Sequence, residues 1–175
     1  MYQPGKLDKP KLSDLADRIK PAVEKLDQAT QLNKGAGASA ETQKGYDEAT
    51  FEWSLAMYTF LIFDDDDFAV SKERERMRED ALAEVTEMRR KATELTQRGD
   101  DASITLGLVI HANINEYEAL YVRFLECQAL AVSSSDDQII SDTTRTLATQ
   151  YATDAFLAME NILAKNEYLY GEAGE

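Results

Sequence analysis

The sequence predicts an all-α protein, an antiparallel bundle of four long helices plus a kinked N-terminal helix. All three prolines, Pro4, Pro10 and Pro21, precede residue 22 of the 175-residue chain. Beyond them, apolar residues recur at spacings of three and four, which is the period of an amphipathic helix. No segment alternates apolar and polar residues for long enough to indicate a strand. We expect a single domain over residues 1–175, because a chain of this length buries a proper core.

The first predicted helix covers about residues 11–32 and contains Pro21. Proline removes a backbone donor and clashes with the preceding turn, so we expect a kink, with Pro21 as the first residue of the second piece. The stretch 33–41 is rich in Gly, Ala and Ser and is predicted to be a flexible linker. Such a tether would let the first helix pack on its own bundle or on a neighbouring copy.

The second helix is expected over about residues 42–63 and the third over about residues 69–98. The aspartates of residues 64–67 fit the start of the third helix, because acids at a helix N-terminus favour the macrodipole. A calcium loop would need spaced ligands and a central glycine, which this run lacks. The third helix has a narrow apolar stripe among dense charges, the pattern of an outer helix.

The fourth helix is expected over about residues 102–132, directly after Gly99, which would supply a left-handed C-terminal residue. So short a connection makes the third and fourth helices antiparallel neighbours. Two faces of the fourth helix are apolar, which predicts a central position in the bundle. Only a narrow arc that includes Glu126 is predicted to be solvated.

The fifth helix is expected to begin at a capping box formed by Ser135 and Gln138 and to end near Tyr170. Its residue Asp154 lies near an apolar stripe. Asp154 could therefore meet His111 of the fourth helix across the core and raise the pKa of that imidazole.

Polar residues on an apolar face mark the candidate site. His111, Asn115 and Glu118 recur at i, i+4 and i+7 of the fourth helix. An unpaired buried polar group costs roughly 1–3 kcal/mol, so these side chains need partners. One interpretation makes them, with Asp154, the ligand-binding anchors of a pocket inside the bundle. The other is that they bond one another, waters or neighbouring helices.

Catalytic and metal motifs are missing from the sequence. His111 is the only histidine, and no Glu-x-x-His pair of the kind found in two-metal bundles occurs. Cys127 lies on a buried face without an activating cation, and no glycine-rich phosphate loop is present. We therefore expect neither an enzyme nor a bound metal or cofactor.

The charge of the sequence indicates which classes of partner are favoured. The net charge is −14 at pH 7, and the residues after 100 carry twelve acids against three basic residues. An acidic surface repels nucleic acid and anionic membranes, and no apolar run reaches the ~20 residues that span a bilayer. The single cysteine fits the cytoplasm, while an extracytoplasmic location stays open if a leader or anchor was removed.

These observations favour a non-enzymatic protein-interaction module. It would be an adaptor, or an inhibitor or immunity-type protein, that turns an acidic surface toward a basic protein partner. A homodimer is a second arrangement that the sequence leaves open. The alternative function is a sensor or small-ligand-binding helical bundle with a polar pocket in its core, cut from a membrane-anchored receptor.

Overall fold

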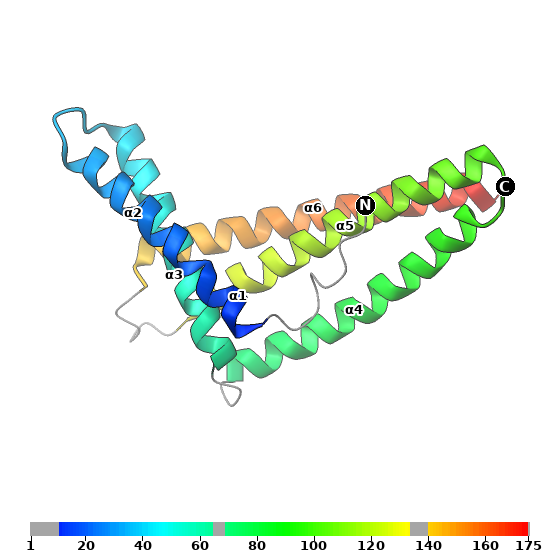
Figure 1. Ribbon diagram of the computed structural model, residues 1–175, viewed down its shortest axis with the longest axis horizontal. Coiled ribbons are helices and arrows are strands. Elements are labelled where there is room, and N and C mark those ends of the chain that lie inside the picture. Colours follow the sequence, from blue (N-terminus) through cyan, green and yellow to red (C-terminus); the bar gives the residue numbers. More distant parts are fainter. Residues whose placement is uncertain (1–10, 65–68, 134–139, 175) are drawn as a thin grey trace. The chain divides into compact units, whose positions relative to one another are not determined.

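The computed structural model describes residues 11–64, 69–133 and 140–174, and every regular element in these ranges is a helix. The helices are α1 (Leu12–Asp17), α2 (Ile19–Lys34), α3 (Ala40–Asp64), α4 (Ala69–Thr96), α5 (Asp101–Ala131) and α6 (Asp142–Gly174). Figure 1 shows α1 and α2 as one bent N-terminal helix that precedes four long helices. The predicted all-α fold with a kinked first helix is thus confirmed.

The bend lies at Arg18, just before Pro21. Proline at position 21 has no N–H to donate to the carbonyl of Asp17, where α1 ends. The second piece nevertheless starts at Ile19 rather than at Pro21, because proline is tolerated anywhere in the first turn, where the backbone N–H groups lack helical acceptors.

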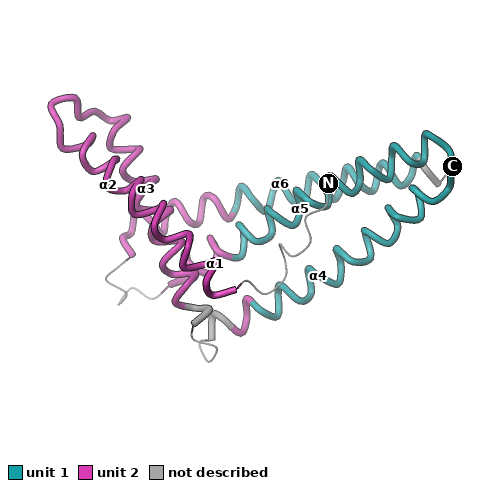
Figure 2. Tube along the Cα trace, viewed as in Figure 1, with its two compact units in different colours: residues 1–9, 75–125, 153–175 teal, residues 10–74, 126–152 magenta. Residues whose placement is uncertain are grey.

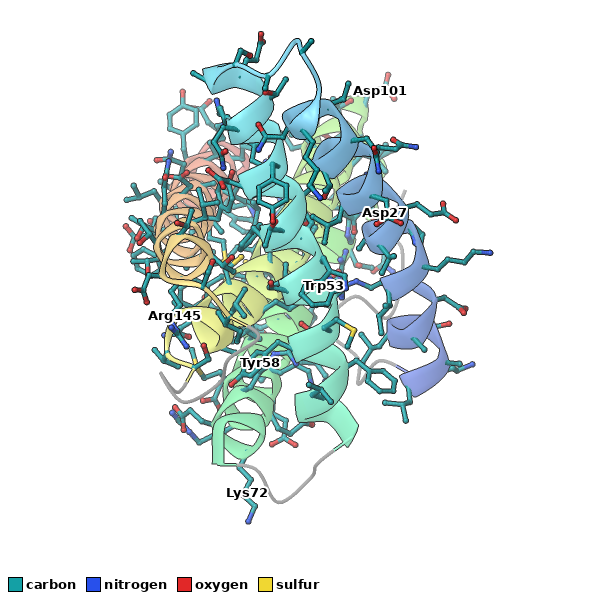
Figure 3. The ribbon with its side chains drawn as sticks, turned by 90° about the vertical axis from the view of Figure 1, so that its left-hand side faces the viewer. Asp27, Trp53, Tyr58, Lys72, Asp101 and Arg145 are labelled. Carbon is teal, nitrogen blue, oxygen red and sulfur yellow. The ribbon has the colours of Figure 1, made fainter. Side chains whose placement is uncertain are left out.

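The predicted linker is shorter than expected and is held by hydrogen bonds. The turn between α2 and α3 covers only residues 35–39. The backbone N–H of Ser39 donates to Oγ1 of Thr42 at 2.7 Å, and the backbone N–H of Thr42 donates to Oγ of Ser39 at 3.3 Å, a reciprocal cap. Consequently α1 and α2 pack against α3 as a helical hairpin. Figure 3 labels two residues of α3, Trp53 and Tyr58.

The described chain forms two compact units, coloured separately in Figure 2. Unit 1 contains Glu75–Leu125 and Thr153–Glu175, and unit 2 contains Pro10–Arg74 and Glu126–Ala152. Helices α4, α5 and α6 each contribute residues to both units.

Each unit has its own buried apolar residues. The core of unit 1 combines residues of α4, α5 and α6: Ala81, Val85, Ala92, Leu95, Ile110, Ile114, Tyr117, Met159 and Ile162. In unit 2, Phe51 of α3 is fully buried and its ring lies 5.0 Å from that of Tyr151 of α6. The narrow stripe predicted for the third helix is therefore the buried edge of α4.

Helices α4, α5 and α6 run antiparallel in unit 1. Gly99 has a φ of 85° and reverses the chain after α4, and Oδ2 of Asp100 accepts the backbone N–H of Ser103 at 2.9 Å. Between α5 and α6, Phe124 pairs with Phe156 and Asn113 pairs with Asn166, so residue numbers rise on one helix as they fall on the other.

Several boundaries and faces differ from expectation. Helix α6 begins at Asp142, where Oγ of Ser141 accepts the backbone N–H of Thr144 at 3.2 Å, and it continues past Tyr170 to Gly174. The predicted capping box at residues 135–138 and the aspartates of residues 65–67 lie outside the described residues. None of the described helices combines the length and apolarity that crossing a bilayer requires.

The fourth helix is less enclosed than predicted. Leu108 and Val109 of α5 are 60% and 43% exposed, although a helix with two apolar faces was expected to be central. In contrast, Glu126 was assigned to the solvated arc and is buried. A helical wheel gives the angle of each side chain but not where neighbouring helices begin and end, and both errors follow from this.

Candidate functional site

Glu118 and Asn115 share one arginine in the interior of unit 1. Glu118 is 1% exposed, and Nη2 of Arg89 donates to its Oε2 at 3.0 Å. The same Nη2 donates to Oδ1 of Asn115 at 2.9 Å. Arg89 comes from α4, so the two residues predicted to be polar anchors are bonded to a neighbouring helix. For Asn115 and Glu118 the contacts are those of the second interpretation, in which these polar side chains bond to a neighbouring helix.

Sequence reasoning missed Arg89 because α4 carries many charges. The signal was its position one helical turn after Val85, at the edge of the buried stripe. An arginine there can lay its aliphatic stem along the core and direct its guanidinium inward.

His111 lies one turn from Asn115 and is half-buried. Burial lowers the pKa of its imidazole below the ordinary value of 6.5, and the positive charge of Arg89 lowers the same pKa further. The imidazole is therefore held in its neutral form near pH 7.

Asp154 does not join this group. The structure places its side chain on the exposed surface of α6, and the pKa of His111 is lowered rather than raised. The predicted His111–Asp154 pair is thus wrong. The reason is the rotation of α6 about its own axis. The sequence placed Asp154 near the apolar stripe, but in the structure Asp154 lies on the outer side of the helix.

A second buried carboxylate lies in unit 2. Glu126 is 6% exposed, and the guanidinium of Arg18 binds it with two hydrogen bonds of 2.8 and 3.1 Å. Arg74 approaches the same carboxylate at 3.7 Å. This bidentate pair ties the bend between α1 and α2 to the last turns of α5. Both buried acids of α5 are therefore neutralised and do not contribute to an acidic surface.

An open groove runs between the outer sides of α5 and α6 in unit 1. Its volume is about 690 Å³, and its lining includes Val109 and Asn113 of α5 and Asn161, Lys165 and Tyr168 of α6. Asn113 donates from Nδ2 to Oδ1 of the buried Asn166 at 3.0 Å, which fixes one wall of the groove.

Two of the groove's lining residues, Val109 and Tyr168, are large exposed apolar side chains. Leu108 of α5 and Leu157 of α6 are also exposed on the same two helices, and Leu157 precedes the lining residue Asn161 by one helical turn. Exposed acids lie on the same two helices: Glu116, Asp154, Glu160, Glu167 and Glu172. We call this groove and its apolar rim the α5–α6 surface. An apolar patch rimmed by polar groups is typical of a protein-binding site.

The described residues offer little for metal or covalent chemistry. Nowhere in the described ranges do three His, Cys, Asp or Glu side chains gather closely enough to hold a metal ion. Cys127, the single cysteine of the sequence, is buried, as predicted. Comparisons of this chain with protein-family models, with curated proteins and with solved structures gave no match.

Proposed function

We propose that this protein is a non-enzymatic interaction module that binds a protein partner through the α5–α6 surface. The observation that carries the proposal is the exposure of Val109 and Tyr168 in the lining of one groove, with Leu108 and Leu157 exposed on the same two helices. Tyrosine is enriched among the few residues that dominate the binding energy of protein interfaces, so Tyr168 is the expected anchor.

Charge supports a basic partner. The α5–α6 surface carries exposed acids around its apolar residues, and the whole chain has a net charge of −14. Acids at the rim of an interface steer a basic partner into place and repel acidic competitors. An adaptor, or an inhibitor or immunity-type protein, would use the surface in this way.

A photo-crosslinking experiment tests the proposal. A benzophenone amino acid replaces Tyr168 in one variant and the exposed Glu94 of α4 in a matched control. Each purified variant is irradiated in a lysate of the source cells, and adducts are identified by mass spectrometry. We expect one predominant adduct from position 168 that excess unlabelled protein removes, and no such adduct from position 94. Identical adduct patterns at the two positions would contradict the proposal.

A further inference from the structure

One exposed stripe of α6 has an ordered pattern of charge. Its residues follow helical spacing along a single face and are all exposed: Asp154, Leu157, Asn161, Lys165, Tyr168 and Glu172. At a rise of 1.5 Å per residue the stripe is about 27 Å long. Its two ends are acidic, its centre carries a lysine, and apolar or amide groups fill the remaining positions.

Helix α5 provides the other wall along part of this stripe. Val109 and Asn113 line the groove opposite Lys165 and Tyr168, and the exposed Glu116 follows them by about one turn. The groove is therefore lined mainly by apolar and amide groups with one cation, Lys165, and exposed acids lie beyond its lining on both helices.

We propose that the occupant of this groove is an amphipathic helix of a partner protein, and the proposal rests on the function proposed above. The helix carries an apolar stripe, a basic residue near each end and an acidic residue opposite Lys165. A groove between two helices accepts a third helix through contacts at i, i+3, i+4 and i+7. A peptide strand would need an exposed sheet edge, and the described residues contain only helices.

Symmetry argues against a second copy of this chain as the occupant. If two copies met antiparallel about the middle of the stripe, Asp154 of one would face Glu172 of the other. If they met parallel, each charged residue would face its own copy. Both arrangements put like charges opposite one another, which is destabilising. A partner with the opposite order of charges avoids this repulsion.

Exchange of the central charge tests the proposal on the whole chain. The probe is a labelled helical peptide of about 20 residues with leucines at the apolar positions, lysines at both ends and a central glutamate. A second peptide differs only in a central lysine. Fluorescence anisotropy measures the binding of both peptides to the wild-type chain and to the Lys165→Glu variant.

We expect the wild-type chain to bind the first peptide about fivefold more tightly than the second, because an exposed ion pair contributes a factor of this size. For Lys165→Glu the preference between the two peptides should reverse. Leu157→Asp should weaken both peptides at least tenfold. Circular dichroism confirms that the variants remain folded. A peptide in which one central leucine of the probe is replaced by proline should bind neither chain.

Three results would overturn the proposal. These are equal binding of helical and proline-containing peptides, an unchanged preference in Lys165→Glu, and a dimer in sedimentation that Tyr168→Asp dissociates. If position 168 crosslinks to a non-helical segment of a partner, the helix proposal fails while the interaction function stands. If position 168 yields no specific adduct, the interaction function itself fails.

Discussion

Burial of the Glu118 carboxylate inside a helical bundle is energetically unfavourable by itself. Removing a carboxylate from water costs several kcal/mol, and its attraction to a buried cation recovers this only when the geometry is good. Here Nη2 of Arg89 lies 3.0 Å from the carboxylate and 2.9 Å from the amide oxygen of Asn115. The guanidinium thus joins α4 to α5 in a single orientation, and loss of either charge leaves the other buried.

Glu118→Gln should therefore lower the free energy of unfolding by about 3 kcal/mol, because Arg89 would keep its charge without the carboxylate. The double variant Glu118→Leu with Arg89→Met should be more stable than Glu118→Gln, since apolar residues of similar volume remove both desolvation costs. Urea unfolding of the three chains measures the difference. A single variant within about 0.5 kcal/mol of wild type would show that the pair contributes little.

His111 should make stability depend on pH near neutrality. Its pKa in the folded chain lies below the ordinary value of 6.5 because of burial, and then because of the charge of Arg89. Between these two values the unfolded chain binds more protons than the folded chain, so stability falls as the pH falls from 6.5 toward the folded-state pKa.

We expect the Tm of the wild-type chain to decrease as the pH is lowered from 6.5 toward the folded-state pKa of His111. The His111→Gln variant should lose part of this decrease in Tm. An NMR titration of the imidazole should give a midpoint below 6.5. A midpoint at or above that value would mean that the imidazole is solvated or paired with an acid.

At this scale the sequence identified the polar residues but not their partners. The spacing of His111, Asn115 and Glu118 placed them on one face of a helix, and two of the three share a buried arginine. Arg89 and Arg18 were missed because a pairing between helices depends on helix rotation and register. Neither quantity is encoded in the local periodicity of one helix.

At Gly107, α5 approaches α4 closely in unit 1. A Cβ added there would lie 2.5 Å from Cγ2 of Thr96 and 2.8 Å from the carbonyl oxygen of Ala92. The threonine methyl can rotate away, but a backbone oxygen can move only if α4 moves. Glycine at position 107 therefore fits this contact where a larger residue would clash, although its helix propensity is low.

Gly107→Ala should lower the free energy of unfolding by about 1–2 kcal/mol, because overpacking outweighs the gain in helix propensity. Gly45→Ala in α3 is the matched control, since a Cβ there meets nothing within 4 Å. That change should raise the free energy of unfolding by about 0.5–1 kcal/mol. Urea unfolding tests both variants, and equal effects of the same sign would contradict the close approach.

The long helices could be predicted because their periodicity extends over many turns and their ends carry strong signals. The positive φ of Gly99 follows directly from residue type, and the structure shows that Asp100 caps the next helix. The turn at residues 35–39 was extended too far in the prediction, because its composition is that of a linker. Its order comes from the reciprocal cap between Ser39 and Thr42, which composition does not reveal.

At the scale of the whole molecule, sequence charge translates only partly into surface charge. Glu118 and Glu126 count toward the acidic C-terminal part of the chain, yet both are buried against arginines. The exposed acids that remain, such as Glu116 and Glu172, are those that a partner would meet. Whether an acid is exposed depends on tertiary packing. Composition therefore predicted the sign of the surface charge but not how that charge is distributed over the surface.

Self-repulsion should be measurable as a salt dependence of stability. The chain carries a net charge of −14 at pH 7, and repulsion among like charges destabilises the folded state. Added salt shortens the Debye length from about 30 Å at 0.01 M to about 3 Å at 1 M and so weakens this repulsion. Salt also screens favourable pairs such as Arg90 with Glu87 and Glu94, but exposed pairs of this kind contribute little.

We therefore expect Tm at pH 7 to rise by several degrees between about 0.02 M and about 0.5 M sodium chloride. The double variant Glu160→Lys with Glu167→Lys replaces two exposed acids and should respond less steeply, because its net charge is smaller. Differential scanning calorimetry of both chains over the same salt series provides the measurement. Equal slopes for the two chains would assign the salt effect to general exclusion of ions from apolar surface, whereas a fall of Tm with salt would mean that attractive pairs dominate the charge balance.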